Sequence, residues 1–218
     1  MGVSLGRRVK VPGLALLAAL LVACARQPLP PATPTAPRPT PLPAPTQVPR
    51  EQGDVPPGFL RHIDQVGGYT LIYPDDWARL PGKGGSVRFV ANPLALAEPS
   101  PAASAMAIIL PGQVAELESA SGKVIRNSKD LLEYVLEGLR AEQNPNVGPV
   151  ELFESNGLVF AAAQVSYYDT DYRLGVRVWV AATVRGERAL VAVTGSPQEE
   201  FDTYLPLFQR MVRTLRML

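Results

Sequence analysis

The side chains that could carry acid–base chemistry are few in this sequence. His62 is the only histidine, and Asp64 follows two positions later, so the two could form a general base with its carboxylate partner. A single histidine excludes the two-histidine motifs of zinc hydrolases. We expect His62 to be exposed, just ahead of the first strand and close to a linker, and therefore to be a bystander rather than a catalytic group.

Two other short segments offer weak signals for ligand chemistry. Gly82 to Gly85 is rich in glycine, but it lacks the Gly-Lys-Thr element of a phosphate-binding loop and precedes a strand, which favours a flexible loop. Asp169-Thr170-Asp171 could contact Ca²⁺, yet two carboxylates without the glycine and glutamate of a calcium loop are more typical of a plain turn. With no Gly-x-Ser-x-Gly motif either, the sequence predicts no catalytic, cofactor-binding or metal-binding residue and no enzyme activity.

A group of aromatic and basic residues beside that turn has two interpretations. It could form a polar-aromatic recognition surface, or its members could be ordinary sheet side chains that lie under a helix, which we favour. The residues are Tyr167, Tyr168, Tyr172, Arg173, Arg177 and Trp179.

The remaining candidate for chemistry is Cys24, the only cysteine of the chain. Three basic residues between Arg7 and Lys10 precede an apolar run over residues 11–23, which is the arrangement of an export signal. A membrane-spanning helix needs about 20 apolar residues, so this run is too short to remain as an anchor. The run ends in Leu21-Val22-Ala23-Cys24, which resembles the lipobox of bacterial lipoproteins.

The lipobox resemblance implies that the Cys24 thiol receives a diacylglycerol and that residues 1–23 are removed as a signal peptide. Two or three acyl chains would then hold the protein stably at the extracytoplasmic face of the cell membrane. The alternative is that Cys24 is only a small apolar residue of the signal. Because the chain has no other thiol, no internal disulfide is expected.

Residues 24–57 are predicted to be a tether that begins at the lipidated cysteine. From Pro28 to Pro57 the chain has twelve prolines and no hydrophobic periodicity, so nothing there offsets the backbone entropy of folding. Proline drives such a segment toward extended polyproline II. Docking to an aromatic groove and O-glycosylation are alternative uses of this composition, but no docking sequence is evident and we favour a spacer.

Residues 58–218 are long enough to form one folded domain with a sizeable core. This segment has fifteen Lys and Arg residues against eighteen Asp and Glu residues, a net charge of −3. It shows no basic patch of the kind that binds nucleic acid, so no nucleic-acid partner is expected.

Hydrophobic patterns predict several short strands and two helices in this domain. The first strands are expected at Tyr69–Tyr73, Ser86–Ala91 and Ala105–Leu110, with a long loop over Pro93–Ser104. A helix should then begin with Ser128 as its N-cap and end before Asn144-Pro145. Its apolar face consists of Leu131, Leu132, Val135, Leu136 and Leu139.

Two hairpins are predicted after this helix. Asn156-Gly157 is the strongest turn signal, because both turn positions need a positive φ, and it separates strands at Val150–Glu154 and Leu158–Tyr168. The second hairpin joins Tyr172–Val184 to Arg188–Thr194.

A closing helix is predicted to start at Ser196-Pro197-Gln198-Glu199, which is a capping box with proline at the first helical position. Pro206 either kinks this helix near Asp202 or marks the point where its main part begins. The apolar stripe consists of Phe201, Tyr204, Leu205, Phe208, Met211, Val212 and Leu215.

The strand Leu158–Tyr168 is apolar on both faces, so both faces of the sheet must be covered by other elements. Hairpins imply antiparallel pairing, and two helices separated by several strands can pack on opposite faces. The predicted fold class is therefore α+β, an α/β/α sandwich around a mainly antiparallel sheet.

A family resemblance supports this architecture. The stretch from Gly68 to Trp77, GYTLIYPDDW, resembles the opening strand of PsbP-like domains, and the stripe from Phe201 to Arg216 is similar to their final helix. The resemblance extends from Phe59 to Leu218 in the order of elements and implies an α/β/α sandwich. The family includes extrinsic subunits of photosystem II as well as lipoproteins of no assigned role, so the resemblance does not imply a photosynthetic function.

Together these features predict a membrane-tethered extracytoplasmic lipoprotein that acts as a non-catalytic binding or assembly module. We expect it to have a protein partner at the membrane and no cofactor. The alternatives are an envelope enzyme of another type and a small-ligand carrier, and a carrier would need a sizeable apolar cavity.

Overall fold

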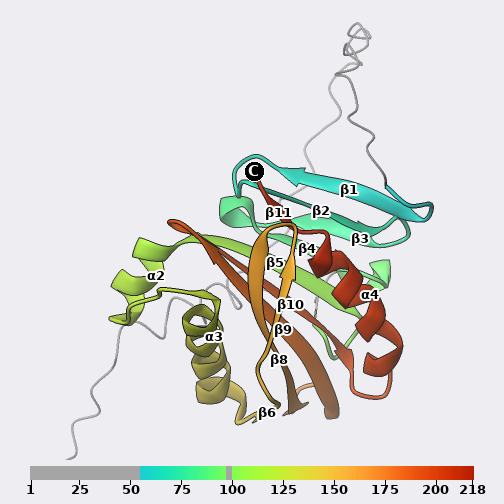
Figure 1. Ribbon diagram of the computed structural model, residues 1–218. Coiled ribbons are helices and arrows are strands. Elements are labelled where there is room, and N and C mark those ends of the chain that lie inside the picture. Colours follow the sequence, from blue (N-terminus) through green and yellow to red (C-terminus); the bar gives the residue numbers. More distant parts are fainter. Residues whose placement is uncertain (1–54, 97–99) are drawn as a thin grey trace, which may run out of the picture.

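The computed structural model describes residues 55–96 and 100–218. The predicted signal peptide, Cys24 and the tether up to residue 54 lie outside the described residues. The described part is a mixed α+β domain in which the strands pair antiparallel throughout (Figure 1).

The large sheet has eight strands, of which the three longest follow one another in the chain. Their order is β3 (Ala78–Pro81), β4 (Val87–Val90), β5 (Met106–Gln113), β10 (Arg188–Pro197), β9 (Leu174–Arg185), β8 (Leu158–Asp169) and β6 (Asn146–Val147), and β7 (Glu151–Ser155) also pairs with β8.

The Asn156-Gly157 turn forms as predicted between β7 and β8. Both residues have a positive φ, 52° and 71°, which suits a two-residue turn whose twist matches that of the strands. The side-chain amide of Asn156 also donates to the backbone oxygens of Arg213 (2.8 Å) and Leu215 (3.1 Å). The turn therefore fixes the register of its own strands and also holds the end of the closing helix.

A second, smaller sheet brings together the first and last strands of the described domain. It has the order β1 (Phe59–Asp64), β2 (Tyr69–Pro74) and β11 (Arg216–Met217). No strand was predicted at β1, because His62 and Asp64 occupy inward positions where an apolar alternation would place hydrophobic residues.

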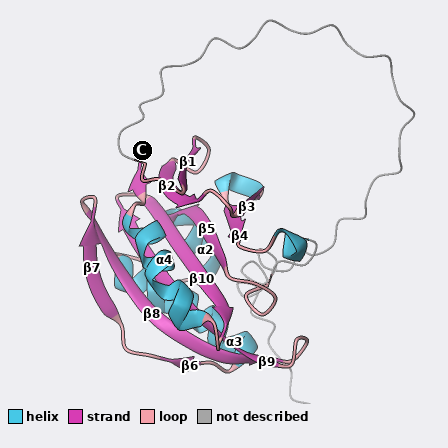
Figure 2. Cartoon of the chain, turned by 90° about the vertical axis from the view of Figure 1, so that its right-hand side faces the viewer, coloured by secondary structure: helices cyan, strands magenta, loops and turns pink. Residues whose placement is uncertain are grey.

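Helices cover both faces of the large sheet, as Figures 1 and 2 show. α4 (Phe201–Arg213) and the small sheet cover one face, whereas α3 (Ser128–Gln143) and the short α2 (Val114–Ser121) lie on the other. The mixed α+β class and the antiparallel sheet are thus confirmed.

The core divides into two main clusters, one on each face of the sheet. Successive residues of β8 alternate between them: Phe160 and Ala162 pack toward α4, and Ala161 and Val165 pack toward α3. This confirms that both faces of the strand are covered, although Val159 stays 52% exposed near the sheet edge.

The predicted N-cap of α3 is wrong by one residue. The side-chain oxygen of Asn127 accepts hydrogen bonds from the backbone N–H groups of Lys129 (2.8 Å) and Asp130 (3.1 Å). Ser128 instead donates its hydroxyl to the backbone oxygen of Val159 at 2.6 Å, which ties the start of α3 to β8. Asparagine and serine can both cap a helix, but here the Ser128 hydroxyl is bonded to β8 and Asn127 is the cap.

The predicted capping box of the closing helix is also wrong. Ser196 and Pro197 are the last residues of β10, where they pair with β9, so strand pairing extends through the sequence that resembles a cap. α4 begins at Phe201 without a side-chain cap and contains Pro206 within it. Sheet hydrogen bonds from a ten-residue strand outweigh one local capping interaction.

Candidate functional site

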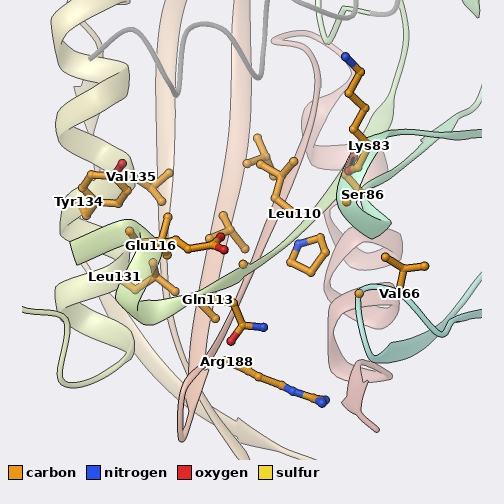
Figure 3. A pocket seen from close by; sticks show the side chains of 18 of the residues that line it. Val66, Lys83, Ser86, Leu110, Gln113, Glu116, Leu131, Tyr134, Val135 and Arg188 are labelled. Carbon is orange, nitrogen blue, oxygen red and sulfur yellow. Dashed lines mark hydrogen bonds between the residues drawn. The ribbon is translucent and has the colours of Figure 1, made fainter. Parts of the chain in front are cut away.

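A cavity of about 400 Å³ lies between α2, α3 and the large sheet, and it is the strongest candidate site within the described residues (Figure 3). Its position follows from unequal cover of this face. α3 packs on β8 and β9, and a helix about 10 Å wide covers roughly two strands that are about 4.8 Å apart. β10 and β5 are left to α2, which has eight residues and none of them buried.

The edge of β5 opens the cavity further. β4 pairs with β5 only over Met106–Ile109, so Leu110 to Gln113 have β10 as their strand neighbour on one side and the loops before β2 and β4 on the other. The space between α3 and those loops is therefore bridged by side chains rather than by a strand or a long helix.

The interior of the cavity is apolar. β5 and β10 supply its floor, and α3 and α2 supply a wall. A lining of this kind favours ligands with a substantial apolar part, since binding removes apolar surface from water on both sides. The principal apolar side chains are Leu110, Leu117, Leu131, Val135, Val191 and Val193.

Polar side chains stand around the mouth of the cavity. Figure 3 shows Lys83 and Arg188 at opposite ends of the lining group, whereas Glu116 comes from the first turn of α2 and Gln113 from the end of β5. The Arg188 guanidinium donates to the backbone oxygen of Leu218 at 2.8 Å, which holds it in place. Burial raises the pKa of the Tyr134 phenol on α3, so its hydroxyl stays protonated at neutral pH and can donate a hydrogen bond.

This set of side chains suits binding better than catalysis. The titratable groups of the lining are Lys83, Glu116, Tyr134 and Arg188, which provide neither a nucleophile with an adjacent base nor paired carboxylates. Across the described ranges, no three His, Cys, Asp or Glu side chains gather in a way that could hold a metal ion.

The glycine-rich segment before β4 forms part of this mouth. The sequence predicts a flexible loop there, but Lys83–Gly85 forms a 3₁₀ turn in which Gly84 and Gly85 have φ values of 61° and 79°. Glycine is the residue that adopts such angles without strain. Tyr69 donates its hydroxyl to the backbone oxygen of Gly85 at 2.9 Å, so the turn is fixed from the core side.

Sequence reasoning named none of the lining residues as a site. They come from the β1–β2 turn, the turn before β4, the end of β5, α2, α3 and β10. An empty volume depends on how far apart these elements settle, and no local motif encodes that distance. The apolar residues themselves have the same periodicity as any core residues.

His62 lies away from the cavity, and the expectation that it is exposed is wrong. It belongs to β1 and is only 6% exposed, with its ring edge-on to Tyr69 and Phe89. Nδ1 lies 3.1 Å from the guanidinium of Arg79 and accepts a hydrogen bond from it, which places the ring proton on Nε2. Nε2 is 3.8 Å from the Asp64 carboxylate, too far for a hydrogen bond, so the pair does not form a base dyad.

The acidic turn and its aromatic neighbours have structural roles. The Asp169 carboxylate accepts hydrogen bonds at 3.0 Å from the backbone N–H groups of Asp171 and Tyr172, as a plain turn requires. Arg177 and Trp179 lie under α4, where the Arg177 guanidinium donates to Asp202 at 3.0 Å, which confirms the favoured interpretation for these two residues.

Other members of that group differ from the prediction. Arg173 has a φ of 56° and lies in the turn before β9, so it does not alternate with Arg177 along a strand. Tyr168 and Tyr172 are 59% and 38% exposed. Burial and the nearby Asp169 carboxylate raise the pKa of Tyr167 to about 12. These residues do not converge on the cavity.

Comparisons with known proteins identify the fold. No protein-family model matches the sequence, and no curated protein matches it. The domain is similar to the solution structure of cyanobacterial PsbP (CyanoP) from Synechocystis sp. PCC 6803, with a TM-score of 0.52 and 14% identity, over 77% of this chain and 99% of that one. This similarity supports a PsbP-like fold and shows nothing about function.

Two weaker similarities have a TM-score of 0.46. One is to a Bacteroides thetaiotaomicron VPI-5482 protein, 14% identical over 72% of this chain and 48% of that one. The other is to a Pseudomonas aeruginosa protein of unknown function, 12% identical over 73% and 97%. Within the described part of the chain, no helix has the length and apolar character needed to cross a membrane.

Proposed function

Starting from a PsbP-like fold with an apolar cavity, we propose that this chain is a non-catalytic binding module that holds a small ligand with a large apolar part. We further propose that Cys24 carries a lipid that anchors the module at the extracytoplasmic face of the cell membrane. The proline-rich segment up to residue 57 is then the tether. The cavity between α3 and β10 is the observation that carries the binding part of this proposal.

The character of the cavity supports a binding role. Its volume of about 400 Å³ lies within the usual size of small-ligand pockets. Apolar side chains line the interior and a few polar groups surround the mouth, which is the arrangement that binds an apolar body and orients a polar end. Ser86 in the lining donates its hydroxyl to the backbone oxygen of Lys83 and has no side-chain base beside it among the described residues, so we propose a non-catalytic role.

A fluorescent fatty acid tests the binding site. We expect cis-parinaric acid to bind the full chain saturably with increased fluorescence, because the apolar chain leaves water inside the cavity. Val193→Phe places a larger ring in the cavity and should weaken binding at least about tenfold, equivalent to about 1.4 kcal/mol. Fluorescence titration measures both affinities.

Val159→Phe is the matched control, because Val159 lies on the same face of the sheet but does not line the cavity. The same substitution there should leave probe binding unchanged. Residues 1–54 are identical in all three proteins, so any probe bound by them cancels in the comparison. Absence of saturable binding, or equal binding by the two variants, would contradict the proposal.

A membrane-associated protein partner is a second candidate function, favoured by the edge of the large sheet at β7. Val150, Leu152 and Val159 are about half exposed there, at 49%, 53% and 52%. Among the described residues β7 pairs only with β8, so its outer edge can accept an added strand. If assembly were the function, Leu152→Glu should abolish partner capture from solubilised membranes and leave cis-parinaric acid binding intact.

A further inference from the structure

The charges of the domain are strongly segregated. Residues 58–90 and 206–218 contain seven Lys and Arg residues and three Asp and Glu residues, a net charge of +4. Residues 91–205 contain eight and fifteen, a net charge of −7. Figure 1 shows β1 to β4, the end of α4 and β11 gathered at one end of the molecule, so a domain that is acidic as a whole has one basic end.

The outer face of the small sheet concentrates this positive charge. Strand register places Ile63, Thr70 and Arg216 in one row across the sheet, with Arg61 in the next row on the same face. The guanidinium of Arg210, from the last turns of α4, lies 4.3 Å from the centre of the Phe59 ring at the other end of β1. Three guanidinium groups therefore belong to, or lie beside, the outer face of the small sheet.

Apolar side chains project among these arginines. Ile63 is 54% exposed on the outer face of β1, and Val66 in the following turn is 81% exposed. Arginine around exposed aliphatic residues suits the boundary between lipid headgroups and acyl chains, where both kinds of group find partners.

We propose that this basic end, formed by β1, β2, β11 and the last turns of α4, docks on an anionic lipid surface. Asp75 and Asp76 lie beside it at the Pro74 end of β2, so contact is strongest toward Ile63 and Arg216. The acidic remainder of the domain is repelled by the same surface, which gives the docked domain one orientation. β1 is also the first strand after the proposed tether, so docking needs no reversal of the chain.

Docking in this orientation has a consequence for the cavity. Val66 and Gly67 belong to the cavity lining as well as to the docking end, so the mouth would face the lipid headgroups. A lipid-like ligand could then enter without crossing bulk water. Docking depends on the charge and the exposed apolar side chains of the basic end, so an experiment can separate it from ligand binding.

The test uses a local reporter in the full chain. Cys24 is the only cysteine, so Ile63→Cys in a Cys24→Ser background gives one thiol for an environment-sensitive dye. Vesicles of phosphatidylcholine alone are compared with vesicles that also contain phosphatidylglycerol. We expect the dye at position 63 to report an apolar environment only with phosphatidylglycerol, and to lose that signal at high salt. Thr170→Cys, in the acidic turn between β8 and β9, should not respond.

Charge variants complete the test. For Arg210→Gln combined with Arg216→Gln, the lipid concentration that gives half of the dye response at position 63 should rise at least about tenfold. Arg126→Gln combined with Arg140→Gln removes the same amount of charge near α3. This control should change the required lipid concentration little. An equal response at positions 63 and 170, a response independent of phosphatidylglycerol, or equal effects of the two double variants would each overturn the proposal.

Discussion

At the residue scale, the imidazole of His62 is held in its neutral form by its surroundings. Burial is the main cause that lowers its pKa, and the positive charge of Arg79 adds to this, while Asp64 acts in the opposite direction. Because the ring proton is on Nε2, a second proton would have to go to Nδ1, where it would break the hydrogen bond with Arg79 and place two positive charges side by side. The only histidine of the chain is therefore sensitive to acid.

The first prediction concerns the pH dependence of stability. Because the pKa of His62 is lower in the folded state, the unfolded chain binds a proton first, at its ordinary value of about 6.5. The stabilisation is complete above that pH and is lost as the pH falls from about 6.5 through the lower folded value. Urea titrations between neutral and mildly acidic pH should show the free energy of unfolding decreasing.

His62→Phe should remove this part of the pH dependence. The phenyl ring would take the place of the imidazole between Tyr69 and Phe89, and Arg79 is exposed enough to be solvated without a histidine partner. The free energy of unfolding at alkaline pH should therefore change by less than about 1.5 kcal/mol. If the free energy of unfolding of this variant fell with pH as steeply as that of the parent protein, another group would be responsible for the pH dependence.

At the element scale, the parts found from sequence are those with a complete local signal. The hairpin at Asn156-Gly157, the helix over residues 128–143 and the strand beginning at Tyr69 all combine periodicity with a turn, a cap or a proline. α2 was missed because it has no buried residue and hence no apolar stripe. The capping box at Ser196 misled because pairing with β9, a contact distant in sequence, decided the structure.

The second prediction compares two positions on α4. Phe208 is fully buried and its ring contacts Trp77, Phe201 and Tyr204. Phe208→Ala should lower the free energy of unfolding by about 3 to 5 kcal/mol, the range for emptying a core aromatic site. Denaturant midpoints at constant slope measure this loss.

Thr203→Ala on the exposed side of α4 is the control and should cost less than about 0.5 kcal/mol. Arg213 also lies on the exposed side, but its guanidinium is 4.8 Å from the centre of the Phe153 ring, so its removal is not neutral. If Phe208→Ala and Thr203→Ala unfolded at the same denaturant concentration, the packing of α4 described here would be wrong.

At the scale of the whole molecule, the layered architecture was predictable and the cavity was not. Covering both faces of β8 requires helices on both sides, which the sequence indicates through Phe160 and Ala161. How completely a helix covers its face depends on sheet width and on the length of α2, and neither is visible in a local pattern. Leu131, Val135 and Leu139, which line the cavity, were therefore predicted only as part of the apolar face of a helix.

The third prediction concerns the anchor, which lies outside the described residues. Cys24→Ser should release the mature protein from the membrane fraction or leave the chain uncleaved, because serine cannot form the thioether that the lipobox resemblance implies. Fractionation and electrophoretic mobility measure the two results. Ala25→Ser is the control and should stay in the membrane fraction, and unchanged behaviour of Cys24→Ser would exclude lipidation.

The small sheet also bears on when this domain can finish folding. The backbone N–H of Ile72 in β2 donates to the Thr214 hydroxyl, 142 residues later, and β2 takes β11 as its second neighbour. Contacts between such distant segments form slowly, because a long loop must close first. If the chain is exported from its N-terminal end, as proposed above, β2 stays incompletely paired until the last residues have crossed. On that proposal, the domain would reach its final form only after translocation is complete.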